Sequence, residues 1–314
     1  MLMDSATVAR FEASRDRLAS LAYRLLGSAA DAEDTVQDAF LGWQAADRRY
    51  VEVPEAWLTK IVTNLALDRL RSARVRHERA IGAWMPEPLL DGDPMLGPAD
   101  TVEQRESVTL AVLTLMERLS PVERAVYVLR EAFSYSHAEI AEILGITESG
   151  SQQHAHRARR RISAARNGID LDPAAARRVV EAFVEAASSG RTERLIALLT
   201  DDATGVSDGR LGLAEQLIRY ANPRRLADAL RIGLKPSAAK RELAGGSPSI
   251  HAVVVNRCPA MLVTLDDRVL GVTILELRDD KIASVRGIAA PHRLTRLTAE
   301  WQRQRHDEPL IDSW

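Results

Sequence analysis

The chain has 314 residues, enough for two domains or three small ones, and its 46% hydrophobic content is ample for packed cores. Its formal net charge of −2 excludes a uniformly basic protein, so any nucleic-acid-binding surface must be local. One cysteine excludes a disulfide framework, a charged N-terminus excludes a signal peptide, and no apolar run reaches the ~18 residues of a membrane span, so we expect a cytoplasmic protein.

Residues 5–80 predict three helices. Apolar residues recur at helical spacing up to Gly27, and Ser28 begins a second helix as an N-cap with an acid three residues on. A third helix starts near Pro54 and carries three polar residues on one face: Asn64, Asp68 and Arg71. Any one of these features would suit an ordinary three-helix bundle. The acid-rich second helix followed by the arginine-rich end of the third is more specific.

Residues 81–105 predict a non-helical connector, because prolines and glycines recur through them. Its Trp84-Met85-Pro86-Glu87-Pro88 stretch would, without other context, be a generic extended linker. A helix resumes near Thr101 and leads into the next block.

Residues 106–168 predict a helix-turn-helix. Ser120 and Ser136 each begin a capping box, with a glutamate three residues on, and Pro121 occupies the first helical position after Ser120. The helix from Ser136 ends at Gly145, and a further helix begins after Thr147. Two helices joined by a short glycine-containing turn form the motif.

The last helix of this block predicts a DNA-binding surface. At 100° per residue, one narrow arc collects small and apolar residues, which we expect in the core: Ser151, Ala155, Ala158 and Ile162. A separate arc faces away from it and holds Gln152, Gln153, His156, Arg157 and Arg160. Glutamine can pair with adenine edges, and arginine reads guanine or binds phosphate. No acidic residue occurs from position 149 to 169. A solvated helical hairpin remains the alternative.

Two separate stretches resemble one family. LSPVERAVYVLREAFSYSHAEIAEILGI, followed by RARRRI, resembles region 4 of bacterial extracytoplasmic-function (ECF) sigma factors, which reads the −35 promoter element. AYRLLGSAADAEDTVQDAFLGW with AWLTKIVTNLALDRLRSAR resembles region 2. WMPEP resembles the WLPEP signature of the group that carries a C-terminal SnoaL-like domain instead of depending on a separate anti-sigma protein.

The resemblance implies two partners, core RNA polymerase (its β′ clamp helices and β flap) and promoter DNA. The positions that would face the clamp helices are Asp34, Gln37, Asp38 and Phe40. The −10 element would be opened by the loop at 47–55 and by the third helix, with Trp57, Asn64, Asp68, Arg71 and Arg74. The −35 residues would be the outward arc above, and the regulatory linker residues would be Trp84, Met85, Pro86, Glu87 and Pro88.

Residues 172–295 predict an α+β domain. Helices come first, opened by the N-cap Asp172 and by Pro173. Four strand-like runs follow, at 250–256, 260–265, 269–277 and 281–288, with turns at Asp266-Asp267 and Asp279-Asp280. This order resembles the cone-shaped NTF2/SnoaL-like fold, whose pocket could hold a small ligand that the sequence does not identify. Residues 296–314 form a polar tail with room for one helix.

Two motifs of the resembled group are degenerate in this domain. Its DGGGK stretch corresponds to residues 207–212, which read SDGRLG, and its NPDKL corresponds to residues 290–294, which read APHRL. Four residues could in principle supply acid–base chemistry, but none has diagnostic spacing: Asp208, His251, Asp266 and His292. We therefore predict no enzyme, cofactor or metal site, and fold alone does not confer catalysis.

The preferred hypothesis is an alternative sigma factor with regions 2 and 4 and a regulatory NTF2-like domain. Two alternatives stay open: a helix-turn-helix regulator with a ligand-sensing domain, and an NTF2-fold enzyme fused to a DNA-binding module. The region 2 stretch argues against the first, because a regulator needs no polymerase-binding helix.

Overall fold

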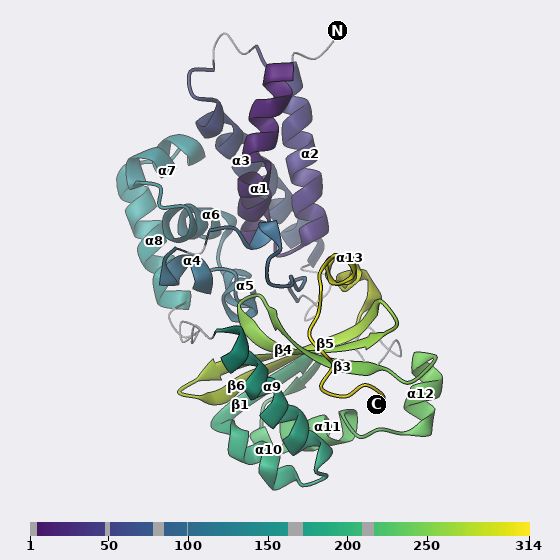
Figure 1. Ribbon diagram of the computed structural model, residues 1–314. Coiled ribbons are helices and arrows are strands. Elements are labelled where there is room, and N and C mark those ends of the chain that lie inside the picture. Colours follow the sequence, from purple (N-terminus) through teal and green to yellow (C-terminus); the bar gives the residue numbers. More distant parts are fainter. Residues whose placement is uncertain (1–4, 48–50, 78–84, 99, 163–171, 209–216) are drawn as a thin grey trace. The chain divides into compact units, whose positions relative to one another are not determined.

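Figure 1 shows the computed structural model, which describes residues 5–47, 51–77, 85–98, 100–162, 172–208 and 217–314. The chain forms two compact units, each with its own core. Among the described residues, the first contains those from 5 to 77, 85–87 and those from 92 to 162, and the second contains 88–91 and those from 172 to 314. The predicted connector is therefore divided between the two units rather than lying outside both.

The first unit begins with a three-helix bundle of α1 (Ser5–Leu26), α2 (Ala29–Ala45) and α3 (Pro54–His77). The side chain of Ser28 accepts a hydrogen bond from Asp31 N, which confirms the predicted start of α2. The bundle core is built from apolar residues at helical spacing, among them Leu18, Leu21, Leu25, Leu58 and Trp43.

A buried arginine ties the following segment to this bundle. Arg24 of α1 is 0% exposed, and it donates from Nε to Ser107 Oγ at 2.9 Å and from Nη2 to Leu96 O at 2.7 Å. Leu96 closes a short 3₁₀ turn, η2 (Pro94–Leu96), and Ser107 follows α4 (Val102–Glu106). A buried guanidinium needs acceptors for its N–H groups, and residues of the second half of the connector supply them. This half of the connector is therefore folded against the helical bundle.

The rest of the first unit is helical. It consists of α5 (Leu110–Met116), α6 (Pro121–Tyr127), the π turn η3 (Val128–Ala132), α7 (His137–Leu144) and α8 (Glu148–Ile162). Both predicted capping boxes are present, at Ser120 and Ser136. Gly145 ends α7 in the left-handed conformation with φ of 66°, as the helix stop predicts.

The second unit is α+β, as predicted. Its helices are α9 (Pro173–Ser188), α10 (Thr192–Leu198), α11 (Pro223–Gly233), α12 (Ala238–Ala244) and α13 (Thr295–Arg303), with the 3₁₀ turn η5 (Pro291–Arg293) before α13. Its strands are β1 (Leu199–Ser207), β2 (Ile218–Tyr220), β3 (Ser249–Val255), β4 (Cys258–Leu265), β5 (Arg268–Arg278) and β6 (Lys281–Ile288).

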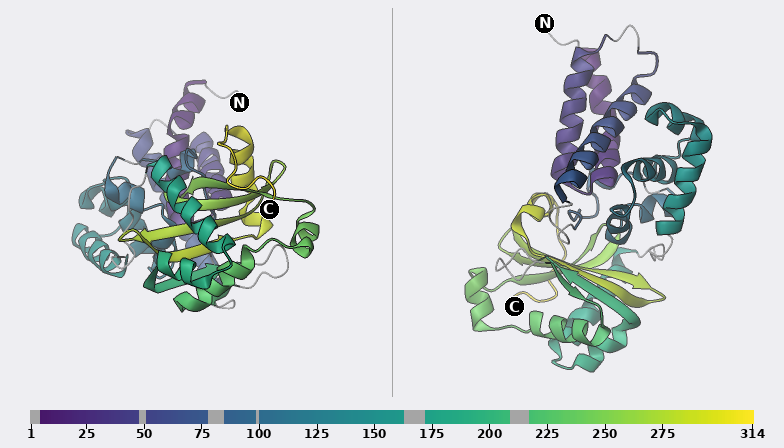
Figure 2. Two further views of the ribbon diagram at one scale, coloured as in Figure 1. Left: turned by 60° about the horizontal axis from the view of Figure 1, so that its bottom comes forward. Right: turned by 180° about the vertical axis from the view of Figure 1, so that it is seen from behind.

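These strands form one curved sheet in the order β2-β1-β6-β5-β4-β3 (Figure 2). The predicted antiparallel meander is β3 to β6, and its last two turns fall at the predicted aspartate pairs. Two strands lie outside the prediction, β1 and β2, and β1 pairs in parallel with β6. The sequence suggests a short helix ending at Ala203, but the helix α10 ends at Leu198, and Leu199 and residues 204–207 pair with β6 far along the chain.

The predicted tail is part of the second unit's core. Leu297 and Trp301 of α13 are buried, and Ile311 forms an isolated antiparallel bridge with Ile250 of β3. Trp314 is 6% exposed and donates from Nε1 to Leu234 O at 2.9 Å. The domain therefore runs on past the predicted boundary at residue 295.

Candidate polymerase- and DNA-binding surfaces

The solvent face of α2 is acidic with one large apolar residue. Asp34, Gln37 and Leu41 are exposed at i, i+3 and i+7, so they lie along one side of the helix. Leu41 is 55% exposed and is absent from the predicted set. Its helical position beside Asp34 and Gln37 was the signal that could have identified it.

The other two predicted α2 residues have partners inside the bundle. Asp38 forms an ion pair with Arg69 of α3. The ring of Phe40 packs against Phe11 of α1, with centroids 4.8 Å apart. Both side chains therefore stabilise the packing of α2 as well as lying on or near its surface.

A glutamate from the connector binds the N-terminus of α2. Glu87 Oε2 accepts a hydrogen bond from Ala29 N at 2.7 Å, and its main-chain N donates to Gly27 O at 2.9 Å. Its carbonyl accepts from Tyr23 Oη at 2.8 Å. A carboxylate is stabilising here because the first backbone N–H groups of a helix have no intrahelical acceptor.

The predicted −10 residues on α3 are of two kinds: three polar residues on an exposed face, and one tryptophan packed against another ring. Asn64, Asp68 and Arg71 are exposed, and Asp68 and Arg71 form an ion pair at 2.9 Å. Trp57 is half-buried, with its ring 5.4 Å from that of Trp43. The Arg74 side chain and residues 48–50 of the predicted loop lie outside the described residues.

The helix-turn-helix has the predicted register. The four residues of the expected core arc are the buried ones of α8: Ser151, Ala155, Ala158 and Ile162. His137 Nδ1 of α7 lies 2.9 Å from Ser151 Oγ and joins the two helices. In the turn, Thr147 Oγ1 accepts from Gly150 N at 3.0 Å and caps α8. All five predicted −35 residues are exposed: Gln152, Gln153, His156, Arg157 and Arg160.

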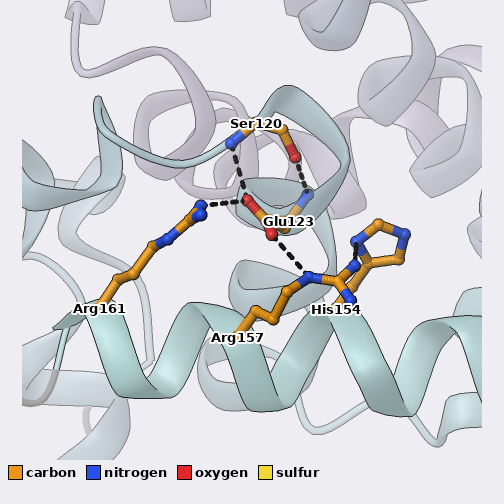
Figure 3. A network of polar contacts seen from close by, with 5 residues as sticks. All are labelled: Ser120, Glu123, His154, Arg157 and Arg161. Carbon is orange, nitrogen blue, oxygen red and sulfur yellow. Dashed lines mark hydrogen bonds and ion pairs between the residues drawn. The ribbon is translucent and has the colours of Figure 1, made fainter.

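Both flanks of α8 carry arginines paired with buried carboxylates. On one flank, Arg157 Nε donates to Glu123 Oε1 at 2.9 Å and Arg161 Nη1 donates to Glu123 Oε2 at 2.7 Å (Figure 3). On the other, Arg159 Nη2 donates to Glu131 Oε1 at 2.6 Å. The sequence identified Glu123 as a capping residue, but not as the partner of these arginines.

The charges around Glu123 shift two pKa values. Burial raises the pKa of the Glu123 carboxyl, but hydrogen bonds from Ser120 and Arg157 and the charge of Arg161 outweigh it and hold the net pKa below its ordinary value. Burial, together with the charge of Arg157, lowers the pKa of His154. His154 is therefore neutral near pH 7, and its Nδ1 accepts from Arg157 Nη2 at 2.8 Å.

Comparison with known proteins identifies the two helical regions. Residues 10–76 match the family model of sigma-70 region 2, and residues 109–162 match that of sigma-70 region 4. The ECF RNA polymerase sigma factor SigJ of Mycobacterium tuberculosis is 40% identical over 215 residues, which cover 68% of this chain and 69% of SigJ. The probable ECF RNA polymerase sigma factor SigI of that species is 33% identical over 299 residues, covering 93% of this chain and 96% of SigI. The chain belongs to the ECF RNA polymerase sigma factors.

A solved structure agrees with this assignment over both units of the sigma factor. The crystal structure of M. tuberculosis extracytoplasmic function sigma factor SigJ matches with a TM-score of 0.66 at 30% identity, covering 92% of this chain and 98% of that chain. The predicted family and fold class are therefore confirmed, including the SnoaL-like domain. As a sigma factor, the protein binds core RNA polymerase and directs it to promoter DNA, and sigma factors are not enzymes.

In the SnoaL-like domain of this sigma factor, the two degenerate motifs meet. Asp208 Oδ1, at the end of β1, accepts from Ala289 N at 2.7 Å and from Ala290 N at 3.3 Å. Arg293 Nε lies 3.6 Å from the other oxygen of Asp208. Asp208 thus orders the APHRL turn. Residues 209–212 of the first motif lie outside the described residues.

Of the remaining acid–base candidates, His251 and Asp266 lie on other parts of the sheet from Asp208. His251 packs edge-on against Trp301, with ring centroids 4.8 Å apart, and Asp266 lies in the β4–β5 turn with φ of 52°. His292 is exposed in η5, beside the Asp208 contacts. In the part of the chain that the structure describes, no group of three His, Cys, Asp or Glu side chains is placed to hold a metal ion, and no helix is long and apolar enough to cross a membrane.

Proposed function

We propose that this sigma factor binds the β′ clamp helices of core RNA polymerase through the exposed face of α2. Region 4 would meet the β flap and read the −35 element with α8, while α3 opens the −10 element. The SnoaL-like domain would regulate these steps through residues 85–91. Core polymerase works in the bacterial cytoplasm, so we infer the same compartment for this protein. The observation that carries the proposal is the exposed row of Asp34, Gln37 and Leu41 along one side of α2, whose opposite side is buried.

The α2 face fits a helical partner with basic groups around an apolar position. A single exposed leucine is ordinary on a protein surface. Here it is 55% exposed and lies on the same side of the helix as a carboxylate and an amide. An apolar anchor with a polar rim is the usual pattern of a binding hot spot.

Competition for core polymerase tests this face. The double variant Asp34→Ala, Gln37→Ala should bind core polymerase about tenfold more weakly, because it loses a charge and an amide without disturbing the buried side of α2. Asp16→Ala is the matched control, since Asp16 is an exposed acid on α1. Circular dichroism should show the same helical content in all three proteins. A double variant that competes for core as well as the parent would overturn the assignment.

The DNA-binding part of the proposal rests on where polar residues are exposed. On α3, Asn64 and Arg71 share a face with the exposed Lys60. On α8, the outward arc contains amides, a histidine and arginines, which suits contacts with base edges and phosphates in the major groove. Run-off transcription with core polymerase, on the region upstream of the protein's own gene, tests promoter recognition directly.

The regulatory part rests on the divided connector. Residues 85–87 belong to the helical unit, where Glu87 binds the N-terminus of α2. Residues 88–91 belong to the SnoaL-like unit, where Leu89 N donates to Asn256 Oδ1 at 2.8 Å and Asn256 N donates to Leu89 O at 2.9 Å. A short chain segment that is held at both ends transmits strain or release between them. A small ligand of the SnoaL-like domain would act through the same segment.

A further inference from the structure

We propose that Glu123 is a positioning residue of α8: by holding Arg157 and Arg161, its carboxylate sets the ratio between promoter-specific and non-specific DNA binding. The proposal deepens the function above and rests on it, because it requires α8 to be the helix that meets DNA. Figure 3 shows the residues involved.

Glu123 holds these arginines with a fixed geometry. It is the third residue of α6, and Ser120 N donates to its Oε2 at 3.0 Å in the capping box. The two arginines approach different oxygens of the same carboxylate, at 2.9 and 2.7 Å. Because the capping bond fixes the carboxylate on α6, the arginine contacts fix both guanidinium groups relative to the rest of region 4.

The pairing is asymmetric in exposure. The Glu123 side chain is 7% exposed, whereas the side chains of Arg157 and Arg161 are 44% and 51% exposed. A buried carboxylate cannot itself reach DNA, but it lies within hydrogen-bonding distance of two groups that could. Its single negative charge balances part of two positive charges at the edge of the DNA-facing helix, which lowers their attraction for any phosphate.

Arg157 keeps donors for DNA while it is held. A guanidinium has five N–H donors, and the contacts with Glu123 and His154 use Nε and one hydrogen of Nη2. His154 Nδ1 accepts from the same guanidinium and adds a second fixed contact. Arg157 is therefore oriented for a directed contact rather than for contact with whichever phosphate lies nearby.

The test is Glu123→Gln, because it separates charge from capping. Glutamine at the third helical position also completes a capping box, so α6 should stay intact. Glu139→Gln is the matched control: Glu139 is the third residue of α7, caps Ser136 in the same way, is exposed and has no described contact with an α8 arginine. Each variant is assembled with core polymerase as the full-length chain. Binding is measured on a random duplex and on the duplex that the parent holoenzyme enriches most from a random pool.

Glu123→Gln should raise the affinity for random DNA. It should also steepen the slope of log affinity against log salt concentration by up to about 0.9. From 200 to 50 mM salt, this amounts to about a threefold extra gain in random-duplex affinity. The ratio of specific to random affinity should fall about tenfold, as expected when a directed contact is lost. Core polymerase is common to all variants, so differences between variants report the substitution. Glu139→Gln should leave the ratio unchanged, and circular dichroism should show the parent helical content for both variants at the assay temperature.

A second background shows whether Glu123 acts through the arginines. In a chain that already carries Arg157→Ala and Arg161→Ala, Glu123→Gln should have no further effect on the ratio. An equal effect in both backgrounds, or a parental ratio for Glu123→Gln in the parent background, would overturn the proposal. If Arg160→Ala also leaves every duplex affinity unchanged, the failure lies instead with α8 as the DNA-binding helix.

Discussion

On α8, neighbouring arginines have different surroundings, and these surroundings decide what each one can do. Arg157, Arg159 and Arg161 pair with buried carboxylates on the two flanks of the helix. Arg160 lies between them on the outward side, together with Gln153 and His156. Helix geometry places Gln153 about 170° from the buried arc but Gln152 only about 90° from it. The sequence treated these residues as one arc, whereas the helix geometry places Gln153 and Arg160 farther from the buried side, so we expect them to approach DNA more directly.

Substitutions on α8 should therefore separate by salt and by sequence. Arg160→Ala should weaken binding to all duplexes and reduce the salt slope by about one unit, as expected for a phosphate contact. Arg157→Ala should reduce the slope by less than one unit, because Glu123 already balances part of its charge. Gln153→Ala should remove base preference, at ~1–3 kcal/mol per bidentate contact, without changing the slope. Holoenzyme binding to specific and random duplexes at several salt concentrations measures both effects. Equal losses on both duplexes for all three variants would contradict the base-reading assignment.

At the scale of elements, α2 depends on a residue distant in sequence. Ser28 caps the helix locally, and Glu87 adds a carboxylate from the connector to the same N-terminus. An N-cap side chain and a favourable charge at a helix terminus each stabilise a typical helix by about 1 kcal/mol. The helix that we assign to polymerase is therefore stabilised at its base by a residue of the WMPEP segment, which gives that segment a physical link to polymerase binding.

Glu87→Ala should lower the unfolding free energy of the helical unit by about 1–2 kcal/mol. Glu87→Gln should cost less, since the amide oxygen still accepts from Ala29 N while the charge is lost. Glu55→Ala provides the comparison, because Glu55 is an exposed acid in the first turn of α3. Urea denaturation followed by far-ultraviolet circular dichroism gives the three values. A midpoint for Glu87→Ala that equals the parent's would mean that the cap contributes nothing.

At the scale of the whole molecule, two units with separate cores share one short segment. The SnoaL-like unit has its own core, which includes Phe183, Leu195, Leu275 and Trp314. This unit binds the connector through Asn256, whose side chain accepts a hydrogen bond from Leu89 N. The backbone of Asn256 has a φ of 49°. The helical unit contains both sigma-region matches, so we propose that the SnoaL-like unit regulates the protein rather than reads DNA.

Truncation after about residue 168 should change run-off transcription, and Asn256→Gly should shift it in the same direction. Glycine tolerates the positive φ, so this substitution removes the amide contact with Leu89 without backbone strain. Asp266→Gly, at another positive φ in the β4–β5 turn, is the control. Loss of inhibition raises activity and loss of a polymerase contact lowers it, so the sign of the shift distinguishes the two modes. Identical activities for the full-length, truncated and Asn256→Gly proteins would show that the domain has another role.

The sequence alone determined the parts of this protein that depend on near neighbours in the chain. Caps at Ser28, Ser120 and Ser136 and the left-handed Gly145 act within one helical turn, so the helix starts and the helix-turn-helix register were predictable. The buried arc of α8 followed from helical periodicity, and the β3–β6 meander followed from apolar runs between aspartate turns. The family assignment followed from two of these local stretches.

Only the tertiary structure decided which distant residues meet. β1 is polar over much of its length and is a strand because β6, far along the chain, offers it parallel hydrogen bonds. Glu123 is 34 residues from Arg157, and Glu87 is 58 residues from the Ala29 N–H that it binds. Trp314 is buried only because the last residues return to β3. No local pattern encodes such pairs, since each is selected by the shape and charge of a surface that exists only after the chain has folded.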